Sequence, residues 1–206
     1  MDVETIKLKR EEVINKFGPW TAHNIQLVGD IYTIKKQVIG DEIGLRRVVQ
    51  IVSDTANKPL ENLRVLDLAC LEGLYCIELA RHGAKVVGIE GREANIEKAR
   101  FVKEVFSLDN LELYVDDVRN LSKEKYGSFD VVLCLGILYH LDASDVFHFL
   151  EKIAEVCQGV AIIDTHISLS AKKSFFYNGK KYWGKTFSEI IRSLPFRKER
   201  RLCGLP

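Results

Sequence analysis

The 206-residue chain lacks the features that would place it in a membrane or an oxidising compartment. No uninterrupted apolar run approaches the length that crosses a bilayer, and residues 1–4 lack the basic and then apolar character of a signal peptide. The five cysteines are an odd number, and none forms a Cys-x-x-Cys pair or a spacing typical of zinc sites. We therefore expect a cytoplasmic protein with reduced, mostly buried thiols, no metal and no membrane association.

The chain also lacks a surplus of charge of either sign. Its net charge of +1 argues neither for nor against a binding partner, because a balanced total does not exclude a local patch. Apolar residues make up 47% of the sequence, which suffices for one good core. We predict one main domain over residues 61–206, preceded by a helical extension or lid over residues 1–60.

A phosphate-binding loop is missing as well. There is no Gly-Lys-Ser/Thr sequence, and the turn at residues 65–73, Val-Leu-Asp-Leu-Ala-Cys-Leu-Glu-Gly, is poor in glycine. Ala69 and Leu71 occupy places where dinucleotide-binding turns use glycine to bring the backbone close to a pyrophosphate. A buried strand, this tight turn and an amphipathic helix nevertheless form half of a nucleotide-binding unit, and Glu90 follows about 20 residues after the turn.

Strands and helices alternate regularly from residue 63 to residue 167. This order predicts a Rossmann-like doubly wound α/β fold with a mainly parallel sheet, helices on both faces and a shortened C-terminal end. The run at 129–135 is the most apolar and so predicts the central strand. We expect the other strands at 85–89, 111–115 and 159–163 and helices at 4–17, 42–56, 93–107 and 143–157.

Four acids, Asp67, Glu90, Asp117 and Asp164, follow directly on predicted strands. Because parallel strands end at one edge of a sheet, these carboxylates predict a ligand site there, which core packing alone would not produce. S-adenosylmethionine has an adenosine and two cationic groups but no phosphate. It therefore suits a turn that is rich in carboxylate and poor in glycine.

These residues resemble the class I S-adenosylmethionine-dependent methyltransferases. The first motif of that family is similar to Val-Leu-Asp-x-Gly-Cys-x-x-Gly, and residues 65–73 match it apart from Ala69. The resemblance covers about residues 63–167. The segment at 135–141 also resembles small-molecule methyltransferases and the tRNA wobble-uridine carboxymethyl-transferase group. The resemblance implies methyl transfer from S-adenosylmethionine to a small molecule or a modified nucleoside.

The resemblance also implies cofactor contacts. Asp67 would hold the methionine ammonium group, and Gly73 would let the backbone pass close to the cofactor. Glu90 would accept hydrogen bonds from both ribose hydroxyls. Asp117 would receive the adenine amino group while the amide of Val118 addresses the ring.

Five further positions complete the expected cofactor site. Glu72 either helps to neutralise the ammonium group or is a solvated residue at the start of a helix, where negative charge is favoured. Ala69 demands ordinary backbone angles because it replaces a glycine. Cys70 could touch the ligand, although packing is the commoner role of a free cysteine. Gly91 and Leu135 are the remaining expected contacts.

Two histidines are candidates for a general base, which an oxygen or nitrogen acceptor can require. His140 comes first because it follows a strand at the expected methyl position, and His166 comes second. Each could equally be a structural histidine that holds a loop. Trp20, His23 and Tyr139 are expected to position the acceptor, although Trp20 and His23 would equally suit a packed junction between helix and domain.

A small molecule is the expected partner, with tRNA as a lesser alternative. Lysines and aromatic residues interleave over residues 172–185, around a predicted hairpin turn at Asn178-Gly179. The alternatives to a methyltransferase are a non-catalytic S-adenosylmethionine-binding protein and, less favoured, a nicotinamide-dependent oxidoreductase. Nothing in the sequence fixes the oligomeric state.

Overall fold

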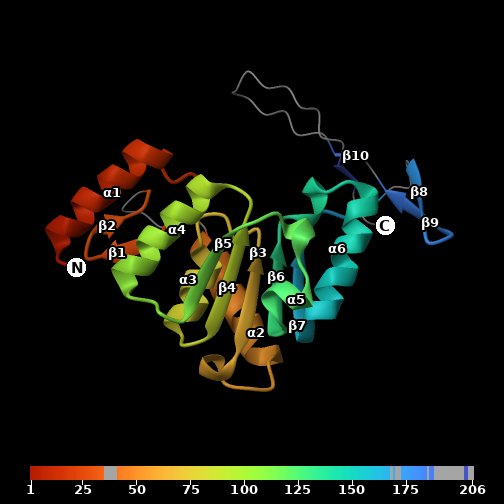
Figure 1. Ribbon diagram of the computed structural model, residues 1–206, viewed down its shortest axis with the longest axis horizontal. Helices are drawn as coiled ribbons and strands as arrows, with labels where there is room; N and C mark the ends of the chain where they lie inside the picture. Colours follow the sequence, from red (N-terminus) through yellow and green to blue (C-terminus); the bar gives the residue numbers. More distant parts are fainter. Residues whose placement is uncertain (35–40, 168, 170–172, 185, 188–201, 204–206) are drawn as a thin grey trace.

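A computed structural model describes residues 1–34, 41–167, 169, 173–184, 186–187 and 202–203. Its centre is a five-stranded parallel sheet in the order β5-β4-β3-β6-β7, with helices on both faces (Figure 1). The predicted Rossmann-like α/β class is confirmed. The strands are β3 (Arg64–Leu68), β4 (Lys85–Glu90), β5 (Leu111–Val115), β6 (Phe129–Leu135) and β7 (Cys157–Asp164).

Side chains alternate between the two faces of the sheet along each strand, so the sheet has a separate hydrophobic core on each face. Val65 and Val131 point to one face, whereas Leu66 and Val132 point to the other, and all four are fully buried. The first core is covered by α2 (Asp41–Thr55), α3 (Leu74–Arg81) and α4 (Glu93–Phe106). The second core is covered by the short α5 (Lys123–Tyr126) and by α6 (Ala143–Val156). Both faces are therefore apolar, as a parallel sheet requires.

The middle of the sheet is β3, and the prediction that residues 129–135 form the central strand is wrong. β6 is an interior strand whose residues are buried on both faces, so its composition gave no indication of which interior place it takes. The chain runs outward from β3 through β4 to β5 and then crosses back to β6. The strand order reverses between β3 and β6, which is where open α/β sheets bind their ligands.

The N-terminal segment packs along the first core. Helix α1 (Val3–Phe17) lies against the outer side of α4, where Lys9 forms an ion pair with Glu104 (Figure 1). A small hairpin of β1 (Gln26–Val28) and β2 (Ile31–Tyr32) follows. Helix α2 buries Val52 completely in the same core. The predicted boundary near residue 60 stays a prediction.

A β-hairpin lies at the opposite end of the molecule from α1 (Figure 1). Strands β8 (Lys173–Tyr177) and β9 (Lys180–Gly184) pair around Asn178 and Gly179, which both have positive φ, so the predicted hairpin is confirmed. Its Tyr177 stacks on Phe147 of α6 at 4.6 Å between ring centroids. The opposite face exposes 73% of Phe176. One aromatic face of the hairpin is thus packed and the other is not.

Short elements complete the described chain. They are η1 (Leu60–Asn62), η2 (Val118–Asn120), η3 (Leu138–His140), β10 (Thr186–Phe187) and β11 (Leu202–Cys203), of which β10 and β11 pair with each other. Across the described ranges, no helix combines the length and the apolar character needed to cross a membrane.

Gly73 provides a test of the turn that joins β3 to α3. Its φ is +88°, and an added Cβ would lie 2.9 Å from the Ala99 Cβ and 2.9 Å from the Ile77 Cδ1. Gly73→Ala should lower the free energy of unfolding by about 2–4 kcal/mol in urea denaturation. The matched control is Gly44→Ala in α2, where the nearest atom is 3.6 Å away; it should raise stability by about 0.5–1 kcal/mol. Equal effects of the two substitutions would contradict this account.

Candidate functional site

The predicted site residues converge on the carboxyl edge of the sheet. Asp67 lies in β3, Glu90 ends β4, Leu135 ends β6 and Asp164 ends β7. Leu135 is aligned with Asp164 in the β6–β7 register. Because all these strands are parallel, their ends share one edge and frame the point where the strand order reverses.

In the turn between β3 and α3, every second residue from 69 to 73 has a left-handed backbone conformation. φ is +56° at Ala69, +48° at Leu71 and +88° at Gly73. The prediction of ordinary backbone angles at Ala69 is wrong, because the turn keeps the conformation that a glycine would adopt freely. For each residue with a Cβ, this conformation costs about 1–2 kcal/mol of free energy. Neighbouring contacts must therefore hold the turn in shape.

Asp67 is a buried acid that faces the first turn of α3. It is 2% exposed, and its Oδ2 accepts a hydrogen bond from the Cys76 backbone N–H at 3.1 Å. This N–H is among those that a helix cannot satisfy internally. Burial raises the pKa of Asp67 to about 7, and the nearby charge of Glu90 contributes in the same direction. Asp67 is thus a carboxylate at which a cation would find little competing water.

Glu90 connects the turn to the neighbouring strand. It is 5% exposed, and its Oε2 accepts a hydrogen bond from Leu71 N at 3.3 Å. Its Oε1 accepts from Arg92 N and from Asn95 Nδ2, both at 3.1 Å. The Arg92 Nε also lies 3.2 Å from Oε1, but that side chain is 70% exposed. A ligand with two hydroxyls could displace the Arg92 side chain at small cost.

Glu72 is neither solvated nor directed at open space. It is 1% exposed, so its interpretation as a solvated helix-start residue is wrong. Its Oε1 accepts from Thr21 N at 2.9 Å and from Lys98 Nζ at 3.2 Å, and its Oε2 accepts from Ala22 N and His23 N at 3.0 and 2.9 Å. These four donors fill the usual lone-pair positions of a carboxylate. Cofactor contact by Glu72 stays a prediction.

Burial alone would raise the pKa of Glu72. The amides of His23, Thr21 and Ala22 outweigh that effect, so the pKa lies below its ordinary value. Glu72 is therefore an ionised carboxylate inside the protein.

Two residues predicted to position the acceptor belong to the N-terminal junction. The His23 Nδ1 accepts a hydrogen bond at 3.1 Å from the N–H of Leu74, the first residue of α3. His23 also meets the Tyr75 ring edge-on at 6.1 Å. Trp20 is 3% exposed and contacts Phe101 of α4 at 5.9 Å between ring centroids. These contacts support the packed-junction interpretation, and the acceptor roles stay predictions.

The two acids after β5 have different environments. Asp116 is held by Tyr126 and Asn120 and fixes the segment that follows the strand. Asp117 is more open, and a hydrogen bond from the Arg119 side chain lowers its pKa. Val118 is buried in the second core. Asp117 is the more exposed of the pair, and both of its carboxylate oxygens accept hydrogen bonds from Arg119. The adenine contact stays a prediction.

The aromatic and imidazole residues after β6 and β7 come together. The Tyr139 ring lies 4.4 Å from that of His140 and 4.5 Å from that of His166. Tyr139 and His140 are half-buried and His166 is exposed. The structure thus unites both predicted bases around Tyr139, whereas Trp20 and His23 lie in the N-terminal junction. The catalytic roles of the two histidines stay predictions.

Cys70 and Gly91 complete the predicted set. The contact with Cys76 and burial both raise the pKa of the Cys70 thiol, so Cys70 is a packing residue rather than a reactive one. An added Cβ at Gly91 would come only within 3.8 Å of the Asp116 carbonyl oxygen. Gly91 therefore has space beside it for a larger group.

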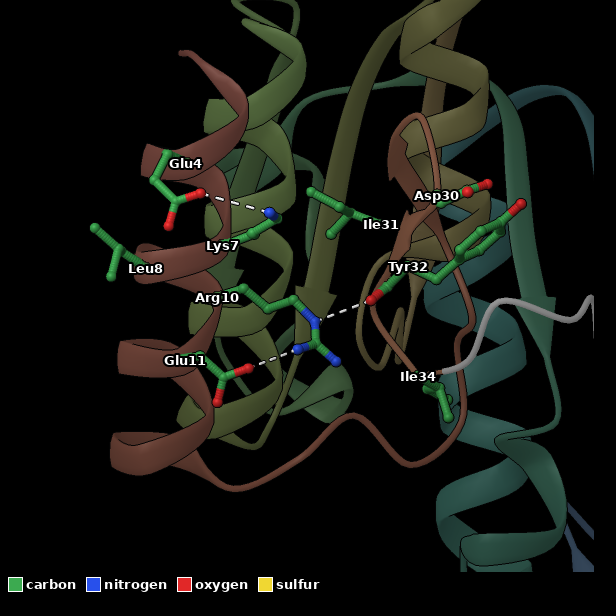
Figure 2. Close-up of a pocket in the computed structure, with 9 residues that line it drawn as sticks. All are labelled: Glu4, Lys7, Leu8, Arg10, Glu11, Asp30, Ile31, Tyr32 and Ile34. Atoms are coloured by element: carbon green, nitrogen blue, oxygen red, sulfur yellow. Dashed lines mark hydrogen bonds and ion pairs between the residues drawn. The ribbon is translucent and has the colours of Figure 1, made fainter.

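A cavity of about 550 Å³ lies elsewhere, between α1 and the β1–β2 hairpin (Figure 2). Arg10 crosses it to donate hydrogen bonds to the carbonyl oxygens of Tyr32 and Thr33, while its third nitrogen pairs with Glu11. None of its lining residues belongs to the predicted cofactor or acceptor sets. Within the described ranges, no three His, Cys, Asp or Glu side chains gather in a way that could hold a metal ion.

Two residues of this site, Lys98 and Asn95 on α4, are not among those predicted from the sequence. Each is buried, and each donates to a strand-end or turn carboxylate. A signal was available for Lys98, because it lies three residues before Phe101 and four before Val102 on the apolar face of the helix. A lysine on such a face indicates a buried partner.

Comparison with known proteins agrees with this geometry. A family model described as a methyltransferase domain matches residues 59–198. The ubiquinone biosynthesis O-methyltransferase of Chelativorans sp. (strain BNC1) is 36% identical over 103 residues, which cover 49% of this chain and 38% of that protein. That of Bartonella quintana (strain Toulouse) is 33% identical over 111 residues, covering 52% and 42%. The chain thus spans about two fifths of these curated relatives.

Two solved structures extend the comparison. The N-terminal domain of EvdMO1, crystallised in the presence of SAH and D-fucose, is 28% identical with a TM-score of 0.74, covering 99% of this chain and 82% of that one. The magnesium protoporphyrin IX methyltransferase of Synechocystis PCC 6803, with bound SAH, is 25% identical with a TM-score of 0.51, covering 64% and 60%.

The buried acid Asp67 predicts an unusual dependence of stability on pH. Its pKa of about 7 in the folded chain exceeds the unfolded value near 3.8, so the folded state retains a proton that the unfolded state releases. Unfolding free energy should therefore fall between about pH 4 and pH 7, by about 2–4 kcal/mol. Asp67→Asn should remove this loss and be more stable than the wild type at pH 8, as measured by urea denaturation at pH 5 and pH 8.

Asp130→Asn is the matched control. A hydrogen bond from Lys58 lowers the pKa of Asp130, so this residue is ionised at both pH values in both states. Its effect on stability should be the same at pH 5 and pH 8. If Asp67→Asn behaved in the same way, Asp67 would be ionised throughout and our account of it would fall.

Proposed function

This chain belongs to the methyltransferase-domain family, within the class I S-adenosylmethionine-dependent group, and we propose that it methylates a hydroxyl group of a small molecule. The observation that carries the proposal is the row of carboxylates at the ends of adjacent strands. Asp67 lies near the end of β3, Glu90 ends β4 and Asp117 follows β5, and the first two are buried beside the strained turn. This arrangement suits a ligand that has hydroxyls, an amino group and positive charge but no phosphate.

Each carboxylate suits one part of S-adenosylmethionine. Glu90 would accept hydrogen bonds from the ribose hydroxyls after the exposed Arg92 side chain moves aside. Asp67 would be ionised by a nearby ammonium group, since an opposite charge lowers a carboxyl pKa. Asp117, which follows β5 and caps η2, would receive the adenine amino group. The half-buried Leu135 would contribute apolar contact at the end of β6.

The alternative of a nicotinamide-dependent oxidoreductase is disfavoured by the turn. Ala69 and Leu71 keep left-handed backbone and also carry side chains. A pyrophosphate needs bare backbone at such positions, which glycine alone supplies. A non-catalytic S-adenosylmethionine-binding protein is compatible with the same carboxylates and differs only at the acceptor site.

The acceptor chemistry is assigned to residues after β6 and β7. Bound S-adenosylmethionine supplies a methyl group on a sulfonium sulfur, which is open to in-line displacement. A hydroxyl acceptor then has to lose its proton, and a neutral imidazole can accept it. His140 is the first candidate for this base and His166 the second, while Tyr139 lies between the two rings and would align the acceptor.

A small-molecule hydroxyl is favoured as the acceptor. The curated relatives are named as O-methyltransferases, and the EvdMO1 domain was crystallised with D-fucose, a sugar. A modified tRNA nucleoside is the lesser alternative. It would use the exposed face of the β8–β9 hairpin, where the Lys181 ammonium lies 4.3 Å from the centre of the Trp183 ring.

Calorimetric titration with S-adenosylmethionine, S-adenosylhomocysteine and NAD tests the cofactor. We expect micromolar binding of the first two and none of NAD. Glu90→Ala should weaken binding by about 100-fold or more, because two hydrogen bonds to a charged group are lost. Glu104→Ala, an exposed acid on α4, is the control and should leave affinity unchanged. A wild-type chain that binds neither sulfur nucleoside would overturn the proposal.

Substitution of the histidines tests catalysis. With a panel of phenolic and sugar hydroxyls, and release of S-adenosylhomocysteine as the readout, His140→Ala should lower the rate about 10²–10⁴-fold without weakening cofactor binding. His166→Ala should have the smaller effect. His148→Ala on the exposed side of α6 is the matched control. Cofactor binding without turnover of any acceptor would instead favour the non-catalytic alternative.

A further inference from the structure

Glu72 joins three separate parts of the chain at one buried point. Its carboxylate lies in the turn after β3, Lys98 reaches it from α4, and the backbone amides of Thr21, Ala22 and His23 reach it from the N-terminal segment. The Lys98 Nζ also donates a 2.7 Å hydrogen bond to the Pro19 carbonyl oxygen. The N-terminal segment is thus bound by both members of the Glu72–Lys98 ion pair.

The burial of this ion pair makes its contacts interdependent. The side chains of Glu72 and Lys98 are 1% and 5% exposed. Two buried charges are tolerated only when each has its full set of partners, and removing one partner leaves the other charge unsatisfied. The exposed pairs on the surface, such as Lys9 with Glu104, contribute far less. Loss of the buried pair should therefore destabilise all three parts of the chain.

His23 adds a second attachment beside the first. Its Nδ1 accepts from the N–H of Leu74, and Gly73 before it offers no side chain to cap α3. The ring therefore supplies from the N-terminal segment the cap that the helix lacks. Glu72 and Leu74, the two neighbours of Gly73, are both held by the same segment.

We propose that these contacts of Glu72 with Lys98, Thr21, Ala22 and His23, the Glu72 clamp, position the turn at residues 69–73 for cofactor binding. Ala69 and Leu71 hold a strained backbone that glycine would adopt without cost, so an external restraint replaces what glycine would otherwise provide. Glu72 and Lys98 are positioning residues in this assignment. The inference rests on the proposed function, because the ligand of the turn is taken to be S-adenosylmethionine.

The clamp couples the N-terminal segment to the cofactor. If the docked segment favours the binding-competent turn, then bound cofactor must favour the docked segment by the same factor. S-adenosylhomocysteine should therefore slow amide exchange at Thr21, Ala22 and His23.

Lys98→Met tests the clamp without altering the turn itself. Without any ligand, it should speed hydrogen exchange at Thr21, Ala22 and His23, and also at Leu71 and Leu74 in the turn, by about 10-fold or more. It should also weaken S-adenosylhomocysteine binding about 5–30-fold in calorimetry. Lys9→Met makes the same chemical change on α1, removes the pair with Glu104 and should change neither readout.

The outcomes separate the clamp from the proposed function. Faster exchange at Thr21 to His23 with unchanged exchange at Leu71 and Leu74 and unchanged affinity would overturn the clamp. Should Lys98→Met fail to fold, the wild-type chain decides: S-adenosylhomocysteine should slow amide exchange at Thr21, Ala22 and His23, and unchanged exchange with bound ligand would overturn the clamp. A wild-type chain that binds neither sulfur nucleoside overturns the proposed function instead. In that case, the hydrogen exchange rates of Leu71 and Leu74 in Lys98→Met, measured without ligand, still show whether the clamp holds the turn.

Discussion

The left-handed backbone of the turn after β3 is the constraint on which the site depends. Three alternating residues hold positive φ, and two of them carry side chains that disfavour it. The turn directs the Leu71 N–H to Glu90 and brings Cys76 N–H to Asp67. Gly73 is needed there for a second reason, since α4 packs too close to admit a Cβ. A relaxed turn would separate Asp67 from the Cys76 N–H of α3 and Glu90 from the Leu71 N–H.

Stability and function are opposed at this edge of the sheet. Asp67 is buried with a pKa raised to about 7, which disfavours its charged form in the absence of a cation. A core designed for stability alone would place an apolar residue there. A cation that binds beside Asp67 would offset the unfavourable free energy of ionising this buried acid. A binding site can gain affinity for a cationic ligand in this way. The raised pKa of Asp67 is therefore what a cofactor with an ammonium group would lower.

The exposure of the donors, and not their number, distinguishes the two buried glutamates of the site. Glu72 accepts from backbone amides and from the buried Lys98, whereas one of the donors to Glu90 is the exposed Arg92 side chain, which can leave. Saturated groups rigidify a structure, and groups with displaceable partners are available to ligands. In the proposed site, the N-terminal segment and α4 would support the turn, while the strand ends would contact the cofactor.

The sequence by itself determined the alternating α/β fold, the apolar faces of the sheet and the acids at the strand ends, because these follow from local periodicity and from the geometry of parallel strands. It also identified the turn at Asn178-Gly179, whose residues adopt positive φ locally. Only the tertiary structure decided the place of β6 in the sheet, the backbone angles at Ala69 and the burial of Glu72. Each of these depends on partners far away in the chain: Lys98 and Thr21 lie 26 and 51 residues from Glu72, and no local pattern records that they meet.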